Sequence, residues 1–511
     1  MTETNLTLGV DIGTTGCRAC VVAGGRELVA SASLSYEPDR PEPGWAEKDP
    51  RVWWDAFRHI IGEITDQIPA GRLVGISLSS QSTTVIPLDK TFTPQRKAII
   101  WQDNRCADQC ERIREVFGEE RVRQVTGWLP HTFLLWPKIL WLLEHEPDLM
   151  DRTVWLAQIN GFLTQRLCGQ LVLDRSNSVG LPRNVKDLTW NSEFINWRDF
   201  PSQKIPPVVP SSTVVGSVSH ESAQSCGLPP GLPVVAGGLD TVCAALAVGV
   251  FETGRSVEVS GTSGGIGVVS ARPSDAGFLG VTAHVLPDLF LNIAPMSAGG
   301  ASLTWCRDAF CRPEQKEGEE RGVSAYEIME EEVRALEDGP TGLLFAPYLE
   351  GERSPIWDSR TRGALLGLRP DMERASIIKG VMEGTGYALS HNVRLTEDAG
   401  MPIELLRSCG GGSRSEQWNQ LKADIVGRAV VVFPPCRDAA FGAALLAGIG
   451  TNCWTLEDVE EGLDEEEPEI YVPRDEITEL YQKHQVAFEQ IYPHLKEFLR
   501  APDKSSFERD G

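Results

Sequence analysis

The chain has 511 residues, of which 41% are hydrophobic and 23% charged, a composition typical of globular proteins. Its net charge of −24 argues against double-stranded nucleic acid and anionic membrane surfaces as partners, because both bind clusters of lysine and arginine. Twelve cysteines are too few for a disulfide scaffold in a chain of this length, so we expect buried, reduced thiols.

The first ten residues run directly into a strand-like segment and do not resemble a secretory signal. The apolar runs, such as residues 439–450, are much shorter than the ~20 residues that span a membrane. We therefore expect a cytoplasmic protein.

Strand-like and helix-like segments alternate along the chain, which is typical of an α/β protein. Residues 6–11 and 17–23 read as two strands of a hairpin joined by the turn GTTG. Residues 51–67 carry apolar side chains at helical spacing after Pro50. Further segments are predicted as the strands 74–78 and 85–88, which flank SSQSTT, and the buried helix 138–143.

A second copy of the first hairpin occurs near the middle of the chain. Residues 9–23 (GVDIGTTGCRACVVA) resemble residues 256–271 (SVEVSGTSGGIGVVSA), and both read as strand, glycine-rich turn and strand. Two unrelated hairpins would be the alternative explanation. We predict two similar domains, 1–253 and 254–499, followed by a polar tail, 500–511. The acidic run 460–470 is predicted to be a solvated loop.

The two turns are the candidate phosphate sites. The chain has neither a GxxxxGK[ST] loop nor a GxGxxG motif after a strand, so phosphate would be held differently. Glycine lets backbone N–H groups of a turn point toward one anion, although ordinary hairpin turns remain the alternative. The turn residues proposed to hold phosphate are Gly13, Thr14, Thr15, Gly261 and Thr262. Asp11 is placed to bind Mg²⁺, and Arg18 to pair with phosphate.

Asp240 follows an apolar strand and two glycines in VVAGGLD, at the start of an alanine-rich helix. It is either a simple N-cap or a general base that accepts the proton of a hydroxyl group. The paired glycines before it open space for a ligand to approach, and both hypotheses stay open on this motif alone.

Two further motifs could bind ligands. In residues 405–427 a strand meets Gly410–Gly412, and the helix that follows has Ser413 or Ser415 as its N-cap; glycines there would let a flat ring lie against the backbone. In residues 98–110 a strand ends in Trp101 and Asp103, which suits a polyol, because an indole covers C–H faces while polar groups bind hydroxyls. A glycine-rich turn and an edge tryptophan are the alternatives.

Together these motifs resemble the FGGY family of carbohydrate kinases. DIGTTGCR, SSQSTT, WQDNR, VVAGGLD, SGTSG, APYLEGERSPIWD and CGGGSRSEQWNQLKADI occur in the family's order over residues 6 to about 495. The resemblance implies an α/β fold of two ribonuclease-H-like, actin-type domains around a central cleft. It implies a kinase that uses ATP and Mg²⁺ on a small sugar, with the sugar and the first phosphate turn in the N-terminal domain and the nucleotide in the C-terminal domain. A homodimer would be compatible with it.

The resemblance also implies roles for single residues. Asp240 corresponds to the catalytic base, and Asp11 with Asp240 to the metal side. The sugar side comprises Gln81, Ser82, Thr83, Trp101, Asp103, Asp240 and Thr241. The nucleotide side comprises the two turns with Arg18, and Gly300, Thr304, Gly411, Gly412, Ser415 and Asn419.

Within the family the chain is most similar to xylulokinases, notably in residues 44–56, 126–141 and 348–358. It has Ser82 and Thr83 where xylulokinases usually have Met and His, and Thr241 where they usually have Asn. We therefore expect D-xylulose as the substrate, with ribulose, a hexulose or glycerol as alternatives. A sugar or nucleotide sensor without catalytic activity is the other alternative.

Overall fold

The computed structural model describes residues 5–500, so the predicted polar tail lies outside the described residues except for Arg500. The chain forms two compact units. The first unit comprises residues 5–253, 269–292 and 436–467, and the second comprises 254–268, 293–435 and 468–500. The first segment of the first unit ends at Thr253, and the segments 269–292 and 436–467 from the second half of the chain also belong to this unit.

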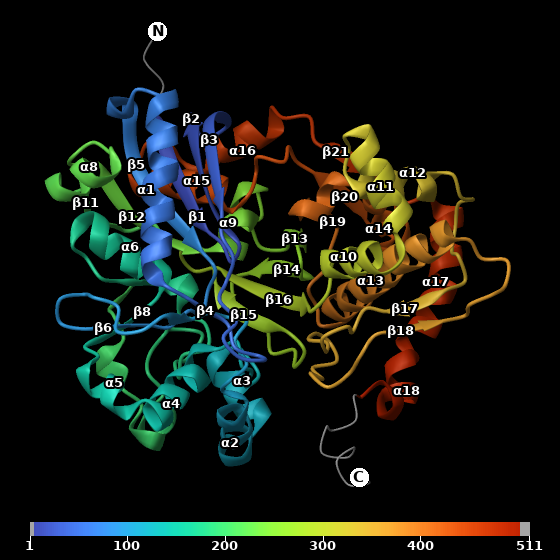
Figure 1. Cartoon of the computed structure of the whole chain (residues 1–511), viewed down its shortest axis with the longest axis horizontal. Coiled ribbons are helices and arrows are strands. Elements are labelled where there is room, and N and C mark those ends of the chain that lie inside the picture. The colour runs from blue at the N-terminus through green and yellow to red at the C-terminus, as the bar shows by residue number, and fades with distance from the viewer. Residues whose placement is uncertain (1–4, 501–511) are drawn as a thin grey trace. The chain divides into compact units, whose positions relative to one another are not determined.

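The first unit is built on a six-stranded sheet of order β11-β12-β5-β1-β2-β3 (Figure 1). The strands of this unit are β1 Leu6–Ile12, β2 Gly16–Ala23, β3 Glu27–Ser35, β4 Glu47–Lys48, β5 Leu73–Ser80, β6 Ile86–Leu88, β7 Ala98–Ile99, β8 Trp155–Ala157, β9 Leu173–Asp174, β10 Val208–Val209, β11 Val214–Ser217, β12 Pro233–Leu239 and β15 Gly280–Ala283. Its helices are α1 Pro50–Gln67, α2 Ala107–Phe117, α3 Glu119–Thr126, α4 Leu135–His145, α5 Pro147–Arg152, α6 Ile159–Cys168, α7 Ser192–Asn196, α8 His220–Cys226, α9 Asp240–Ala247, α15 Ala439–Gly450 and α16 Leu456–Asp464.

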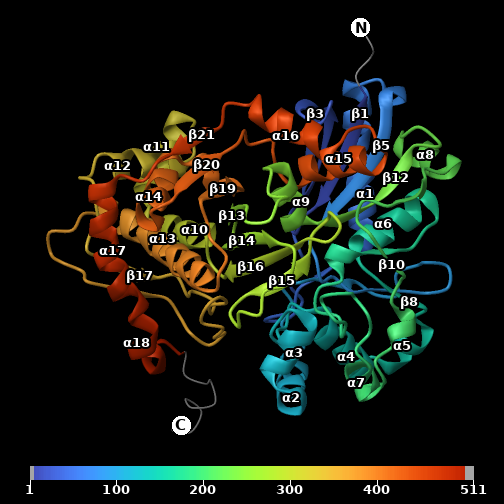
Figure 2. The ribbon, with the colours of Figure 1, turned by 180° about the vertical axis from the view of Figure 1, so that it is seen from behind.

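Helices α1 and α15 cover the sheet of the first unit. Figure 1 shows α1 in front of the sheet, and Figure 2, turned by 180°, shows α15 in front of the opposite face. Helix α1 begins with Asp49 as N-cap and Pro50 at its first position, and it buries the apolar side that the sequence predicted. Helix α15 approaches β1 so closely that a Cβ at Gly9 would lie 1.9 Å from the carbonyl oxygen of Ala440. Only glycine fits at that position.

The second unit repeats the strand pattern of the first. Its strands are β13 Ser256–Ser260, β14 Gly264–Ser270, β16 Phe290–Met296, β17 Leu344–Ala346, β18 Ala364–Leu366, β19 Leu405–Cys409, β20 Ala429–Val432 and β21 Glu469–Tyr471; β14 and β16 each extend a few residues beyond this unit's segments. Its helices are α10 Gly300–Phe310, α11 Arg312–Arg321, α12 Ala325–Arg334, α13 Arg374–Asp398, α14 Glu416–Val426, α17 Asp475–Glu489 and α18 Ile491–Leu499.

Both units place the Gly-Thr turn in the same topological position. In the first unit β1 pairs antiparallel with β2 and parallel with β5, and in the second β13 pairs antiparallel with β14 and parallel with β19. Each turn joins the two strands of the antiparallel pair, where the neighbouring parallel strand also ends. The internal resemblance seen in the sequence is therefore a repeat of topology.

The structure corrects the prediction for the acidic run and bears on the predictions for the cysteines and for membrane-spanning segments. The acidic run 460–470 is not a loop, because α16 continues to Asp464 and β21 begins at Glu469. All twelve cysteines are free, and nine of them are buried. Within residues 5–500 the longest apolar helices fall short of the length and hydropathy that crossing a bilayer requires.

Candidate active site

The first turn is held in shape by its own backbone and by a tyrosine. The N–H of Gly13 donates to the carbonyl of Gly16 (2.8 Å), and the hydroxyl of Tyr36 donates to the carbonyl of Gly13 (2.8 Å). The N–H of Tyr36 also donates to the carbonyl of Thr15, whose side chain is exposed. These bonds fix the turn from the side of β3.

Thr14 links the turn to two residues predicted to bind sugar. Its hydroxyl donates to Oε1 of Gln81 (2.8 Å) and accepts from Nε1 of Trp101 (2.9 Å). Gln81 follows β5 and Trp101 follows β7, so the hydroxyl joins three separate elements. The sequence predicts that Thr14 binds phosphate, and no local pattern in it points to this bridge.

Two aspartates lie at the carboxyl ends of β1 and β12, the two strands that flank β5 in the sheet. Asp11 is in β1 and accepts from the hydroxyl of Ser79 (2.7 Å), and Asp240 is the first residue of α9, directly after β12. Burial, followed by the negative charge of Asp240, raises the pKa of Asp11 to about 7. Burial also raises the pKa of Asp240, although the N–H and hydroxyl of Thr241 donate to its Oδ1 and oppose the shift.

Asp438 is a third carboxylate of this group, and sequence analysis missed it. It caps α15 by accepting from the N–H groups of Ala440 and Phe441, and it adds to the repulsion that raises the pKa of Asp11. Arg18, the predicted phosphate partner, is ion-paired with Asp438. A signal was available, because Asp438 precedes an alanine-rich helix just as Asp240 does.

Asp11 and Asp240 are the candidate ligands for a hard cation in the first unit. Within residues 5–500 no group of three histidine, cysteine, aspartate or glutamate side chains could hold a metal ion. Asp11 and Asp240 offer carboxylate oxygens, the ligand type that Mg²⁺ prefers, and a cation would relieve the repulsion between them. Mg²⁺ typically keeps several waters and takes substrate phosphates as ligands, so two carboxylates are enough to fit it.

The loop Gln81–Thr84 is anchored through Thr83. Thr83 is buried with a positive φ of 57°, its N–H donates to Oε1 of Gln158 (2.8 Å), and its carbonyl accepts from the buried Nζ of Lys138 (2.9 Å). The hydroxyl of Thr83 donates to the carbonyl of Ser82, whose own hydroxyl has no partner among the described residues. In this structure Thr83 anchors the loop, and its predicted contact with sugar stays a prediction.

Asp103 is fully buried and engaged within the protein. Its carboxylate accepts from the N–H of Ala46 (2.6 Å) and from the N–H, Nε and Nη2 of Arg105. The guanidinium of Arg105 lies 3.6 Å from the ring centre of Trp45. Asp103 thus fixes the chain that carries Trp101, and its predicted role in binding sugar also stays a prediction.

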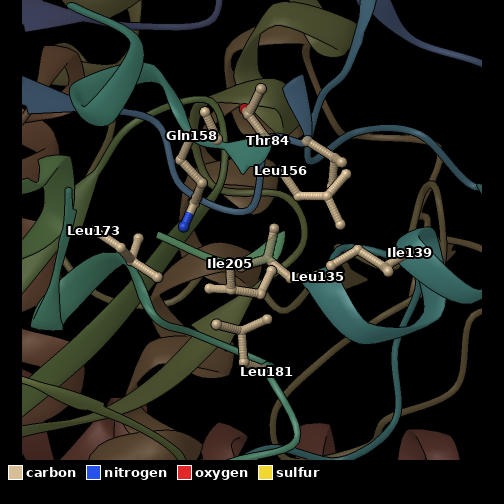
Figure 3. Close-up of a pocket in the computed structure, with 10 residues that line it drawn as sticks. Thr84, Leu135, Ile139, Leu156, Gln158, Leu173, Leu181 and Ile205 are labelled. Atoms are coloured by element: carbon tan, nitrogen blue, oxygen red, sulfur yellow. The ribbon is translucent and has the colours of Figure 1, made fainter. Parts of the chain in front are cut away.

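A small cavity lies beyond the loop Gln81–Thr84 (Figure 3). It is lined by Thr84, Val85, Leu135, Ile139, Leu156, Ala157, Gln158, Leu173, Leu181 and Ile205. Thr84 and Gln158 are the polar residues of this lining, and the hydroxyl of Thr84 has no partner among residues 5–500. None of the predicted catalytic or phosphate residues lines this cavity, so it is not the active site.

In the second unit the turn Gly261–Gly264 binds the start of α10. The carbonyl of Gly261 accepts from the N–H of Gly300 (2.8 Å), and the carbonyl of Thr262 accepts from the N–H groups of Gly299 (3.1 Å) and Ala301 (2.9 Å). Thr262 is exposed, and its hydroxyl has no hydrogen-bond partner within the described part of the chain. Thr304 donates to the carbonyl of Gly300 (3.1 Å) and contacts the hydroxyl of Tyr326 (2.9 Å).

The loop Gly410–Gly412 lies against the same turn. A Cβ at Gly412 would lie 2.4 Å from Oγ of Ser260 and 2.9 Å from the ring of Trp418, whereas one at Gly411 would meet nothing within 4 Å. Ser415 is the N-cap of α14, one of the two positions expected, and buried Asn419 donates to the carbonyl of Ser413 (2.7 Å). The predicted nucleotide residues of this unit are therefore gathered at the carboxyl ends of β13 and β19.

Comparison with known proteins identifies the family. Residues 6–247 match the N-terminal domain of the FGGY family of carbohydrate kinases, and residues 257–451 match the C-terminal domain of that family. The chain belongs to the FGGY family and is a carbohydrate kinase. Kinases of this family use ATP, generally with Mg²⁺.

Individual relatives are similar over almost the whole chain. The chain is 29% identical to a xylulose kinase of Bacillus subtilis over 501 residues, covering 97% of this chain and 98% of the relative. It is 30% identical to a gluconokinase of Bacillus subtilis over 453 residues, 88% of each chain. The crystal structure of xylulose kinase from Rhodospirillum rubrum matches with a TM-score of 0.87 and 28% identity, over 97% of this chain and 100% of that one. The predicted two-domain, actin-type α/β fold is thereby confirmed.

Proposed function

We propose that this carbohydrate kinase transfers the γ-phosphoryl group of ATP to a primary hydroxyl of D-xylulose, with Asp240 as the general base. The observation that carries the proposal is the position of Asp240. It begins α9, close enough for its charge to act on Asp11, and burial raises its own pKa from the ordinary value. A raised pKa makes the carboxylate a stronger base toward the proton that the sugar hydroxyl releases.

Sugar binding and nucleotide binding are assigned to different units of the chain. The Thr14 bridge holds Gln81 and Trp101 together, and the indole of Trp101 would cover a C–H face of the sugar. In the second unit, the turn Gly261–Gly264 and the loop Gly410–Gly412 would bind the nucleotide. Asp11 and Asp240 would hold Mg²⁺, which neutralises phosphate charge when bound.

Two observations concern the choice of sugar. Relatives that are xylulose kinases match 95–97% of this chain, which favours D-xylulose. A gluconokinase is equally similar in identity, and Ser82, Thr83 and Thr241 depart from the usual xylulokinase residues. A second candidate is therefore phosphorylation of another small sugar or of a sugar acid such as gluconate.

The test is ADP release with purified enzyme, ATP and Mg²⁺ over a panel of D-xylulose, D-ribulose, a hexulose, glycerol and gluconate. We expect the highest kcat/KM with D-xylulose. A higher kcat/KM with any other member would overturn the choice of sugar while leaving the kinase assignment intact. The Asp240→Asn variant, measured with the preferred sugar, separates general-base catalysis from background hydrolysis of ATP.

A further inference from the structure

The motif YLEGERSPIWD (348–358) has no part in the function proposed above, yet its centre is buried in the second unit. Three consecutive residues of the motif bind three consecutive residues at the end of β16. Oε1 of Glu352 accepts from the N–H of Ser297 (2.7 Å), and Nη2 of Arg353 donates to the carbonyl of Met296. The N–H of Ser354 donates to the carbonyl of Pro295 (2.9 Å). We call residues 352–354 the clamp.

The clamp is itself fixed from behind by α13. The hydroxyl of Ser354 donates to Oδ1 of Asn392 (2.8 Å), and Nδ2 of Asn392 donates back to the carbonyl of Ser354 (3.2 Å). Asn392 is fully buried, and Glu352 is only 3% exposed. Polar groups buried and bonded in this way hold one geometry, because losing any partner would leave another group unsatisfied.

The segment that the clamp holds leads directly into the predicted nucleotide site. Two residues after Ser297 the chain reaches Gly299, then Gly300, whose N–H groups donate to the carbonyls of Thr262 and Gly261. The clamp therefore sets the position of the first residues of α10, and these in turn hold the turn Gly261–Gly264. Three hydrogen-bonded contacts, Ser354 with Asn392, Glu352 with Ser297 and Gly299 with Thr262, are joined by one or two residues of chain and so link α13 to the turn.

We propose that Glu352 is a positioning residue for ATP, which acts by holding Ser297 and thereby the start of α10 against the turn Gly261–Gly264. This inference rests on the proposed nucleotide site. Glu352 does not contact the reacting atoms in this scheme. Its removal should weaken nucleotide binding and leave the sugar side, which lies in the first unit, unaffected.

Hydrogen bonds to an ionised acceptor are stronger than those to a neutral one, which explains the choice of a glutamate at this position. A carboxylate oxygen can accept two N–H groups, and Oε1 of Glu352 accepts from both Ser297 and Arg353 (2.7 Å each). Glutamine keeps one acceptor oxygen in the same place, whereas alanine keeps none. A graded loss from glutamate through glutamine to alanine would thus identify the hydrogen bonds as the cause.

The chain offers a matched control in Glu383. This glutamate is fully buried in the same unit and, like Glu352, accepts from a backbone N–H, that of Thr341 (3.0 Å), and from the Thr341 hydroxyl (2.6 Å). The segment that it holds is not the turn Gly261–Gly264 or the start of α10. Glu383→Ala should therefore cost stability in the same way as Glu352→Ala without a selective effect on ATP.

The experiment compares the full-length wild type with Glu352→Ala, Glu352→Gln and Glu383→Ala. KM is measured for ATP and for the sugar, and Kd for a non-hydrolysable ATP analogue by calorimetry, each after thermal unfolding has confirmed the fold. We expect Glu352→Ala to raise the KM for ATP and the Kd about 10-fold. Glu352→Gln should raise them less, and the KM for sugar should stay within twofold.

Equal effects of Glu352→Ala and Glu383→Ala on ATP binding, or wild-type binding in Glu352→Ala, would overturn the proposal. If Glu352→Ala does not fold, the Glu352→Gln variant tests the proposal by itself. A wild-type Kd for the ATP analogue in Glu352→Gln would then overturn the proposal. The Gly412→Ala variant distinguishes a wrong role for Glu352 from a wrong assignment of the nucleotide site. Wild-type ATP affinity in Gly412→Ala would count against the site, and the inference on Glu352 would fall with it.

Discussion

The two Gly-Thr turns occupy the same position in two similar sheets but are held by different groups. The first turn is held by side chains, since Tyr36 donates to Gly13 and the hydroxyl of Thr14 bridges Gln81 and Trp101. The second turn is held by backbone, since its carbonyls accept from the first N–H groups of α10. The hydroxyl of Thr14 is thus engaged within the protein, whereas that of Thr262 has no partner among residues 5–500.

The surroundings of the two turns differ in charge as well. Asp11, Asp240 and Asp438 make the first turn's neighbourhood acidic, and burial together with the charges of Asp240 and Asp438 raises the pKa of Asp11. In the second unit the acidic residue nearest in sequence to the turn, Glu258, is buried and paired with Lys422 (3.0 Å). This difference in charge agrees with the proposed roles, a cation and a sugar hydroxyl at the first turn and the nucleotide at the second.

The largest expected effect is the loss of turnover when Asp240, in the acidic surroundings of the first turn, is replaced. Replacing Asp240 by Asn removes the proposed base and keeps the side chain's size, so kcat should fall by ~10²–10⁴-fold. The Kd of the ATP analogue should stay near that of the wild type, because the proposed nucleotide site lies in the other unit. Steady-state kinetics and calorimetry measure the two quantities, and normal turnover would remove Asp240 from the mechanism.

The next largest effect is expected on ATP binding, from a substitution in the loop Gly410–Gly412 beside the second turn. In Gly412→Ala the added Cβ would clash with Ser260 and Trp418, so the loop has to move, and we expect the KM for ATP to rise about 10-fold. Gly411→Ala is the control for the fold, because its Cβ meets nothing within 4 Å. Identical unfolding temperatures and identical ATP affinities in the two variants would show that the loop is not packed as described.

A smaller effect compares the turns directly. Thr14→Val removes the bridge to Gln81 and Trp101 and should raise the KM for sugar roughly 3- to 10-fold, the value of one or two hydrogen bonds. Thr262→Val should raise the KM for ATP by a similar factor and leave that for sugar unchanged. If both variants changed the same KM, the division of labour between the turns would be wrong.

The smallest expected effect is a change in the thermal stability of the Asp11→Asn variant. Burial raises the pKa of Asp11 from 3.8 to about 7, so the folded state binds this proton more tightly than the unfolded state. The ionised carboxylate therefore costs stability above about pH 7, and the cost disappears as the pH falls toward 4. Asp11→Asn should unfold a few degrees higher than the wild type at pH 8 and at the same temperature near pH 4, while losing activity.

Asp89 provides a control of opposite sign for that measurement. Its carboxylate accepts from Thr91, Thr93 and Gln95, and these hydrogen bonds lower its pKa. Its contribution to stability is present above the ordinary pKa and is lost as the pH falls, so Asp89→Asn should be destabilised at pH 8 and not at low pH. A gain in both variants would point to net charge rather than to burial.

Local features of the fold were predictable because local patterns determine them. The hairpin β1–β2, helix α1 and the start of α9 at Asp240 follow from strand alternation, an N-cap with proline, and a glycine pair before an alanine-rich helix. The second hairpin was found by comparing one part of the sequence with another. These signals need no knowledge of tertiary packing.

Contacts between distant segments were not predictable in this way. Nothing in the sequence near Arg18 points to Asp438, and nothing near Thr14 points to both Gln81 and Trp101. The burial of Asp103 with Arg105 depends on Ala46 and Trp45, which lie more than 50 residues earlier in the chain. Such pairings depend on how strands and helices pack in three dimensions.

The packing of α15 on β1 has a consequence for biosynthesis. The hydroxyl of Thr7 donates to the carbonyl of Ala444 (2.8 Å), 437 residues further along the chain, and Gly9 meets the backbone of the same helix. While the ribosome is still translating the second half, β1 has already emerged but its covering helix does not yet exist. The first domain to be made is therefore among the last to be finished. A nascent chain stalled near Thr253 would expose the uncovered face of its sheet to chaperones and to other nascent chains.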